Sequence, residues 1–147
     1  MEILLIEDDE AVREFIREVL LGAGYFVSVA GNGKDGLGEI KRDQDIGMVI
    51  TDIVMPEKEG IETIIEIKQS WPHIKIIAIS GGGRICAEDY LHIARELGAD
   101  ITLKKPFARH ELLGAVAELS SHKNPDVKIP VISDYPAVAE ISGEAAV

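Results

Sequence analysis

Polar side chains that could carry out chemistry follow four apolar runs of the sequence. Three acids, Glu7–Asp9, come directly after EILLI, and Asp52 ends the run GMVITD. Ser80 ends IKIIAIS, and Lys104–Lys105 follow ITL. A carboxylate is costly to remove from water, so an aspartate at the end of a buried-looking run needs partners.

These groups have complementary charges and hydrogen-bonding capacities. Two carboxylates about 4 Å apart at a protein surface repel by about 4 kcal/mol at an effective dielectric constant of about 20. They must share a proton or enclose a cation, and Mg²⁺ suits one or two carboxylates with waters and a phosphate. Lys105 can neutralise an acid or an incoming phosphoryl oxygen. The Ser80 hydroxyl and the amides of Gly81–Gly83 can also bind a phosphoryl group.

Asp52 in such a setting can act as a nucleophile and form an acyl phosphate. Positioning and charge neutralisation supply most of the catalysis in phosphoryl transfer. Purely structural roles stay open for the other groups. Glu7–Asp9 can cap a following helix, Gly81–Gly83 can form a plain turn, and Lys104–Lys105 can be a solvated pair.

Alternating apolar runs and amphipathic segments supply the elements that must position these groups. The runs predict strands at about residues 2–6, 25–30, 48–51, 74–80 and 101–103. Apolar residues at helical spacing predict helices at about residues 12–20, 34–42, 61–70, 87–97 and 109–122. In the third helix, Ile61, Ile64 and Ile65 are expected on the buried face.

This alternation implies a parallel sheet with helices on both faces, joined by right-handed crossovers. Uninterrupted apolar runs such as IIAI indicate strands that are buried on both sides. Ligands of open sheets of this class bind at the carboxyl ends of the strands, where the polar groups described above would gather.

The composition limits the classes of partner. The 147 residues include 26 acids and 15 Lys or Arg, for a net charge of −11. This charge disfavours binding to a nucleic-acid backbone and suits a basic protein surface or a cation. A single cysteine, Cys86, excludes an intrachain disulfide. With no basic signal-peptide region and no apolar run near the roughly 18 residues of a membrane span, we expect a cytoplasmic protein that does not bind membranes.

The periodic pattern ends near residue 122. Beyond it, Pro125, Pro130 and Pro136 interrupt a segment that is less polar than a plain linker. We expect one domain over residues 1–122 and a C-terminal tail over residues 123–147, too short for an output domain. The tail is expected to be disordered or to dock on a domain, and the start of a further domain is a third reading.

The ordered set Glu7–Asp8, Asp52, Ser80 and Lys105–Pro106 resembles the receiver domain of two-component response regulators. The run DIVMPEKEG, which begins at Asp52, is similar to the phosphoacceptor segment of that family. GAD followed by KPF is similar to its strand-five signature, and the resemblance covers about residues 2–121. It implies an α/β, flavodoxin-like (βα)5 fold, a doubly wound five-stranded parallel sheet with strand order 2-1-3-4-5.

The resemblance implies a metal site around the phosphoacceptor. Asp52 would accept the phosphoryl group and, together with Asp8, would bind Mg²⁺ or Mn²⁺ directly. Glu7 would bind the metal through water, and Val54 would bind it through its backbone carbonyl. Asp9 would lie one position past the metal pair.

The resemblance also implies phosphate-binding and switch residues. Lys105 would contact the acceptor carboxylate and then the phosphoryl group, which Ser80 and Gly81 would also bind. Ser80 would turn toward the phosphoryl oxygen as the switch residue. The family often has an aromatic residue three positions before the lysine, where this chain has Thr102. An aromatic flip is therefore excluded at the second switch position.

The implied function is that of a phosphoacceptor response regulator, which is not a conventional enzyme because it catalyses only its own phosphorylation and slow dephosphorylation. A histidine kinase or phosphotransfer protein would supply the phosphoryl group. An unidentified downstream protein would bind the switched surface, and a homodimer stays open.

Three alternatives are a receiver fragment of a longer regulator, a degenerate receiver-like binding module and a Mg²⁺-dependent phosphatase with an aspartyl nucleophile. Phosphatases of the haloacid dehalogenase type have a second aspartate two residues after the nucleophile. Val54 stands there and cannot transfer a proton, which disfavours the phosphatase.

Overall fold

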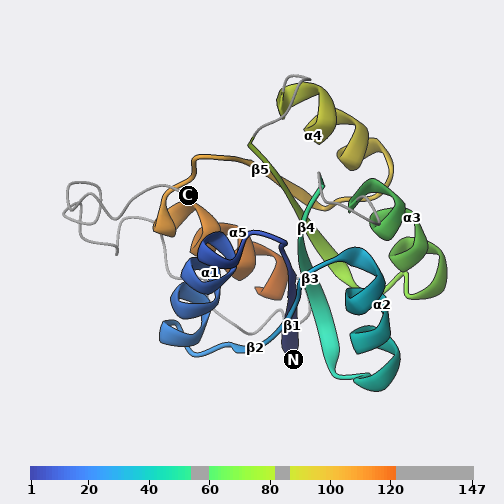
Figure 1. Cartoon of the computed structure of the whole chain (residues 1–147), viewed down its shortest axis with the longest axis horizontal. Coiled ribbons are helices and arrows are strands. Elements are labelled where there is room, and N and C mark those ends of the chain that lie inside the picture. The colour runs from blue at the N-terminus through green and yellow to red at the C-terminus, as the bar shows by residue number, and fades with distance from the viewer. Residues whose placement is uncertain (54–59, 82–86, 122–147) are drawn as a thin grey trace.

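Strands and helices alternate along the chain in the computed structural model, which describes residues 1–53, 60–81 and 87–121 (Figure 1). The strands are β1 (Glu2–Ile6), β2 (Phe26–Ala30), β3 (Ile46–Asp52), β4 (Lys75–Ser80) and β5 (Ile101–Lys104). The helices are α1 (Glu10–Gly22), α2 (Gly33–Arg42), α3 (Gly60–Ser70), α4 (Ala87–Glu96) and α5 (Arg109–Ser121). Each predicted element is present, with bounds within about two residues of those expected.

The strands form one sheet with the order β2-β1-β3-β4-β5. Every pair of neighbours is parallel, and α1, α2, α3 and α4 are the crossover connections between successive strands, whereas α5 follows the last strand. This confirms the predicted doubly wound fold with strand order 2-1-3-4-5. The order places β1 and β3 side by side, so the segments that follow them start from the same edge of the sheet.

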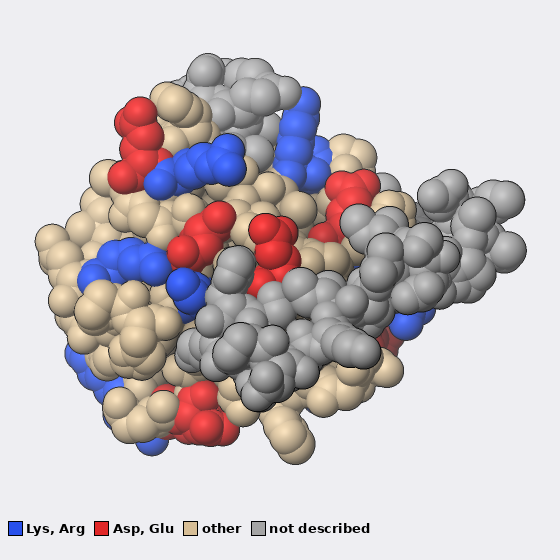
Figure 2. Space-filling view, turned by 180° about the vertical axis from the view of Figure 1, so that it is seen from behind, with Lys and Arg blue, Asp and Glu red and all other residues tan. Residues whose placement is uncertain are grey.

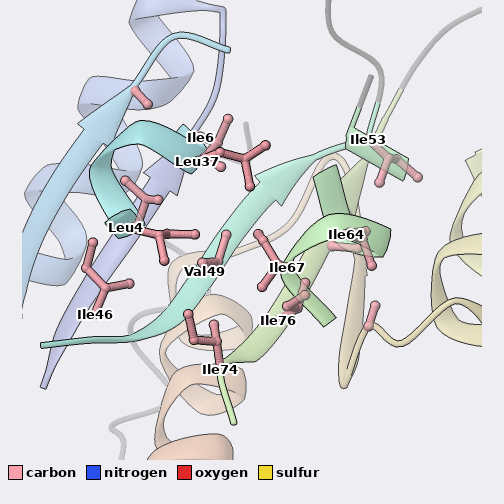
Figure 3. Packing of buried hydrophobic residues seen from close by; sticks show 14 of the residues in the cluster. Leu4, Ile6, Leu37, Ile46, Val49, Ile53, Ile64, Ile67, Ile74 and Ile76 are labelled. Carbon is pink, nitrogen blue, oxygen red and sulfur yellow. The ribbon is translucent and has the colours of Figure 1, made fainter. Parts of the chain in front are cut away.

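Two apolar layers cover the two faces of the sheet because successive side chains of a strand point to opposite sides. Leu4, Ile6 and Val49 pack with residues of α2, α3 and α4 in one layer, which Figure 3 shows from close by. Ile3, Leu5 and Ile50 pack with residues of α1 and α5 in the other. All seven residues of β3 are buried, as expected for a strand that is covered on both sides.

The buried face of α3 differs from the one expected. Gly60, Thr63, Ile64 and Ile67 are buried, whereas Ile65 is only half-buried. The reason lies at the start of the helix, where a Cβ on Gly60 would lie 2.1 Å from the carbonyl oxygen of Asp52. This close approach turns positions 60, 63, 64 and 67 toward the sheet, and these positions form one stripe along the helix. Because two of them are a glycine and a threonine, the stripe does not show as an apolar pattern in the sequence.

Charged side chains of both signs are interspersed on the face of the molecule in Figure 2, where the described residues form no continuous basic patch. Within the part of the chain that the structure describes, no helix is long and apolar enough to cross a membrane. The expectations for Val54, for Gly82 and Gly83 and for the tail lie outside the described residues.

Candidate functional site

The register of the sheet brings the polar groups of four segments to one edge. Neighbouring strands pair at their carboxyl ends: Ile6 with Thr51, Asp52 with Ile79, and Ser80 with Lys104. The residues that end or follow β1, β3, β4 and β5 therefore meet at this edge. This is the place where ligands of an open α/β sheet bind.

Three acids at this edge have the geometry of a cation site. Glu7, Asp8 and Asp52 each contribute one carboxylate oxygen to a group whose members all lie within 4.8 Å of one another. Glu7 is 1% exposed and Asp52 is 7% exposed, whereas Asp8 is exposed. Two nearly buried carboxylates beside a third that faces solvent suit a hard divalent cation that keeps part of its water.

Lys105 joins the two buried acids. Its Nζ donates to Oδ2 of Asp52 at 2.8 Å and to Oε2 of Glu7 at 3.2 Å. When every group is ionised, three carboxylates and one ammonium leave two negative charges uncompensated. The charge of the cluster therefore matches a divalent cation.

The buried acid and the lysine have shifted proton affinities. Burial, and next the charge of Asp52, raise the pKa of Glu7 from 4.5 to about 7. Burial lowers the pKa of Lys105, but its hydrogen bond with Asp52 and the nearby negative charges outweigh that effect, so the pKa is raised. Lys105 therefore stays protonated near neutral pH, where Glu7 is close to half ionised without a cation. A bound cation would favour the ionised carboxylate.

Ser80 places a buried hydroxyl at the end of β4. The residue is fully buried, and among the described residues its Oγ has no hydrogen-bond partner. A buried hydroxyl without a partner is energetically unfavourable, and an oxygen bound within its reach would satisfy it. This is the chemistry expected of a group that turns toward a bound phosphoryl oxygen.

Gly81 allows Lys105 to pack beside the end of β4. A Cβ at this position would lie 2.1 Å from the Cβ of Lys105 and 2.8 Å from its Cγ. The backbones also meet, since the Lys105 amide donates to the Ser80 carbonyl at 2.8 Å. A glycine is therefore needed for this close approach.

Two neighbours of the site residues have other roles. Asp9 is the N-cap of α1, and its Oδ1 accepts from the amides of Ala11 at 2.9 Å and Val12 at 3.2 Å. The capping role left open for the three acids therefore belongs to Asp9, one position past the metal pair. Lys104 is exposed at the end of β5, which separates it from the inward-pointing Lys105.

Thr102 lies half-buried in β5 and pairs with Ala78. Since Ser80 is two residues beyond Ala78, Thr102 and Ser80 fall on the same face of the sheet. The register therefore keeps the two expected switch positions near each other on neighbouring strands. The Val54 carbonyl lies outside the described residues.

The sequence did not reveal two contacts of the site. Lys105 was expected to neutralise an acid, but its direct ion pair with Glu7 was not specified, because sequence order does not show which acid a lysine reaches. Arg13, whose Nη1 donates to the Glu7 carbonyl at 3.0 Å, was also missed. It is one of several charged residues on α1, and nothing in the sequence distinguishes it from the others.

Comparisons with known proteins agree with this geometry. The family profile described as "Response regulator receiver domain" matches residues 3–117. The response regulator MprA of Mycobacterium leprae (strain TN) is 32% identical over 126 residues, which cover 86% of this chain and 54% of that protein. The chain thus spans about half the length of this curated relative.

Solved structures show the same fold. A receiver domain from Clostridium thermocellum has a TM-score of 0.76 and 30% identity, and the match covers 83% of this chain and 95% of that one. A CheY-like receiver domain from Methanospirillum hungatei JF-1 also has a TM-score of 0.76, with 25% identity and coverage of 86% and 98%.

Proposed function

Since the chain belongs to the response regulator receiver domain family, we propose that Asp52 accepts a phosphoryl group in a two-component phosphorelay. The donor is a histidine kinase or a phosphotransfer protein. The observation that carries this proposal is the nearly buried Asp52 carboxylate, which is paired with Lys105 and lies beside two further acids. A receiver domain is not a conventional enzyme, so the reaction modifies the protein itself.

In the proposed reaction, a carboxylate oxygen of Asp52 attacks the phosphorus of a phosphohistidine. The new O–P bond forms as the P–N bond breaks, and the departing imidazole nitrogen takes up a proton. Lys105 would pair with a phosphoryl oxygen, a role that its 2.8 Å bond to the Asp52 carboxylate supports. The Ser80 hydroxyl and the Gly81 amide are the further donors proposed for this group.

Receiver domains bind Mg²⁺ at an acidic pocket of this kind. We propose that Asp8 and Asp52 hold Mg²⁺ or Mn²⁺ directly, Glu7 through water, and Val54 through its backbone carbonyl. The two uncompensated negative charges of the cluster support this assignment. The cation would neutralise charge that develops on the phosphoryl oxygens.

Phosphorylation is proposed to change a partner-binding surface through Ser80 and Thr102. The Ser80 hydroxyl, which has no hydrogen-bond partner among the residues that the structure describes, would gain one by turning toward the phosphoryl oxygen. Thr102 lies on the same face of the neighbouring strand. A threonine is small, so the response at β5 is a local repacking and not the flip of a ring. The output is contact with a downstream protein or a second copy of the chain, and not with nucleic acid.

We further propose residues 1–122 as the receiver unit and residues 123–147 as a tail. The family match ends at residue 117, and α5 ends at Ser121, which supports this boundary. We propose that the protein acts in the cytoplasm, because a histidine kinase is phosphorylated from ATP there.

Intact mass spectrometry tests the proposal. The chain is incubated with a small acyl phosphate and Mg²⁺, with an excess of EDTA as the control, and Asp52→Asn is treated in the same way. We expect one added phosphoryl group in the wild type with Mg²⁺ and none in the other samples. Addition to Asp52→Asn, or no addition to the wild type from either the small donor or a panel of phosphorylated kinases, would favour a degenerate binding module.

A further inference from the structure

Arg13 holds the backbone of the loop that contains two of the three clustered acids. It is half-buried in the first turn of α1, and its Nη1 donates to the carbonyl oxygen of Glu7 at 3.0 Å. The same nitrogen lies 3.8 Å from the place that a Cβ on Gly31 would take. The guanidinium therefore lies between the loop after β1 and the loop after β2.

The bond from Arg13 completes a set of bonds on both sides of Asp8. The Glu7 amide donates to the Ala30 carbonyl at 3.1 Å, so the backbone of Glu7 is bound at both its N–H and its C=O. On the other side, the Asp9 amide donates to Oε1 of Glu7 at 3.2 Å, and the Asp9 side chain caps α1. Asp8 is thus placed between two residues with fixed backbones.

This arrangement matters because Asp8 is exposed. Packing does not hold its carboxylate near Glu7 and Asp52, so its position depends on the backbone that presents it. We propose that Arg13 is a positioning residue for the divalent cation, acting through the Glu7 carbonyl and touching neither the cation nor the phosphoryl group. The inference rests on the proposed function only in that these acids bind a divalent cation.

Because Arg13 is charged, the direction in which its removal changes Mg²⁺ affinity tests the inference. A guanidinium near a cation site repels the cation, so a purely electrostatic role predicts that its removal tightens Mg²⁺ binding. A positioning role predicts weaker binding, because groups that orient metal ligands typically contribute at least tenfold to affinity.

Isothermal titration of the full chain with Mg²⁺ alone, without a phosphoryl donor, measures this effect. Arg13→Met keeps the length and helix propensity of the side chain but removes its donors, and we expect the Kd for Mg²⁺ to rise about tenfold. Arg13→Lys keeps the charge and one donor group, so an intermediate Kd is expected. Arg17→Met is the matched control, because Arg17 lies one turn further along α1, where it pairs with Glu14 at 3.6 Å. We expect this control to leave the Kd within about twofold.

Melting temperatures in EDTA separate positioning from folding. An Arg13→Met protein that melts earlier but binds Mg²⁺ like the wild type would overturn the inference, as would tighter binding. A wild type that binds no Mg²⁺ would overturn it together with the proposed metal site. If the wild type binds Mg²⁺ but accepts no phosphoryl group, the proposed function fails while a raised Kd in Arg13→Met still supports the inference.

Discussion

Glu7 is the residue at which function and stability conflict most clearly. Its carboxylate is 1% exposed, and burial together with the charge of Asp52 raises its pKa to about 7. The lysine that contacts it at 3.2 Å also contacts Asp52, so one positive charge is shared by two acids. In the absence of a cation, the ionised form of Glu7 therefore destabilises the fold.

We expect Glu7→Gln to stabilise the metal-free protein at alkaline pH. An acid whose pKa is raised on folding contributes stability below its unfolded pKa of 4.5, and that stability is lost as the pH rises through about 7. Between pH 6 and pH 8, the wild type should lose about 1 kcal/mol that Glu7→Gln keeps. Urea unfolding in EDTA at the two pH values measures this difference.

The exposed Glu14 provides the control, because Glu14→Gln removes the same charge from solvent. Its stability relative to the wild type should not change between the two pH values. A Glu7→Gln protein whose relative stability is equally constant would show that Glu7 is ionised throughout this range in the native state.

Residue types and their order in the sequence were sufficient to predict which polar groups lie at the carboxyl edge of the sheet. Each group ends or follows an apolar run, and parallel strands bring such positions together. The different roles of adjacent residues could not be predicted in the same way. Asp9 caps α1 while Asp8 joins the acid cluster, a difference set by where the helix begins and not by the side chains.

At the scale of the elements, glycines determine how closely helices approach the sheet. A Cβ on Gly36 would lie 2.4 Å from Cδ1 and 2.8 Å from Cγ1 of Ile6, which is fully buried. Gly38 lies in the same helix with no such neighbour within 4 Å. Helix propensity alone gives both glycines the same destabilising effect on α2, because propensity does not show which side of a helix meets a strand.

This pair predicts opposite effects of one substitution. Gly38→Ala should stabilise the protein by about 0.5–1 kcal/mol, because alanine is the better helix former and has free space there. Gly36→Ala gains the same propensity but must displace Ile6, so a net destabilisation of about 1–3 kcal/mol is expected. Chemical unfolding of both variants measures the effects, and equal stabilisation by both would show that α2 can move away from β1.

The face of α3 shows the same limit of sequence reasoning. Helix and length were predicted from isoleucines, yet the buried stripe includes Gly60 and Thr63. Hydrophobic periodicity cannot identify a glycine that is buried because of backbone contact. The contact with the Asp52 carbonyl joins α3 directly to the end of β3, which links the position of this helix to the candidate acceptor.

At the scale of the whole molecule, the acid cluster lies at the end of the most buried part of the sheet. β1 and β3 are central, and both sides of β3 are covered. A ligand that binds only the folded arrangement of Glu7, Asp8 and Asp52 stabilises the entire cooperative unit by mass action. Metal binding should therefore be visible in global unfolding as well as at the site.

We expect Mg²⁺ to raise the melting temperature of the wild type. At about 100 times the Kd, binding to the native state adds about 2.7 kcal/mol, which corresponds to a shift of about 5–10 °C for a chain of this size. Asp8→Asn is the matched variant, because Asp8 is exposed and its replacement should leave the metal-free melting temperature within about 2 °C. Losing a proposed direct ligand should remove most of the shift. A full Mg²⁺-induced shift of the melting temperature in Asp8→Asn would show that the cation binds elsewhere. Glu14→Gln is the control, and if it keeps the full shift while Asp8→Asn loses it, the stabilisation comes from the clustered acids.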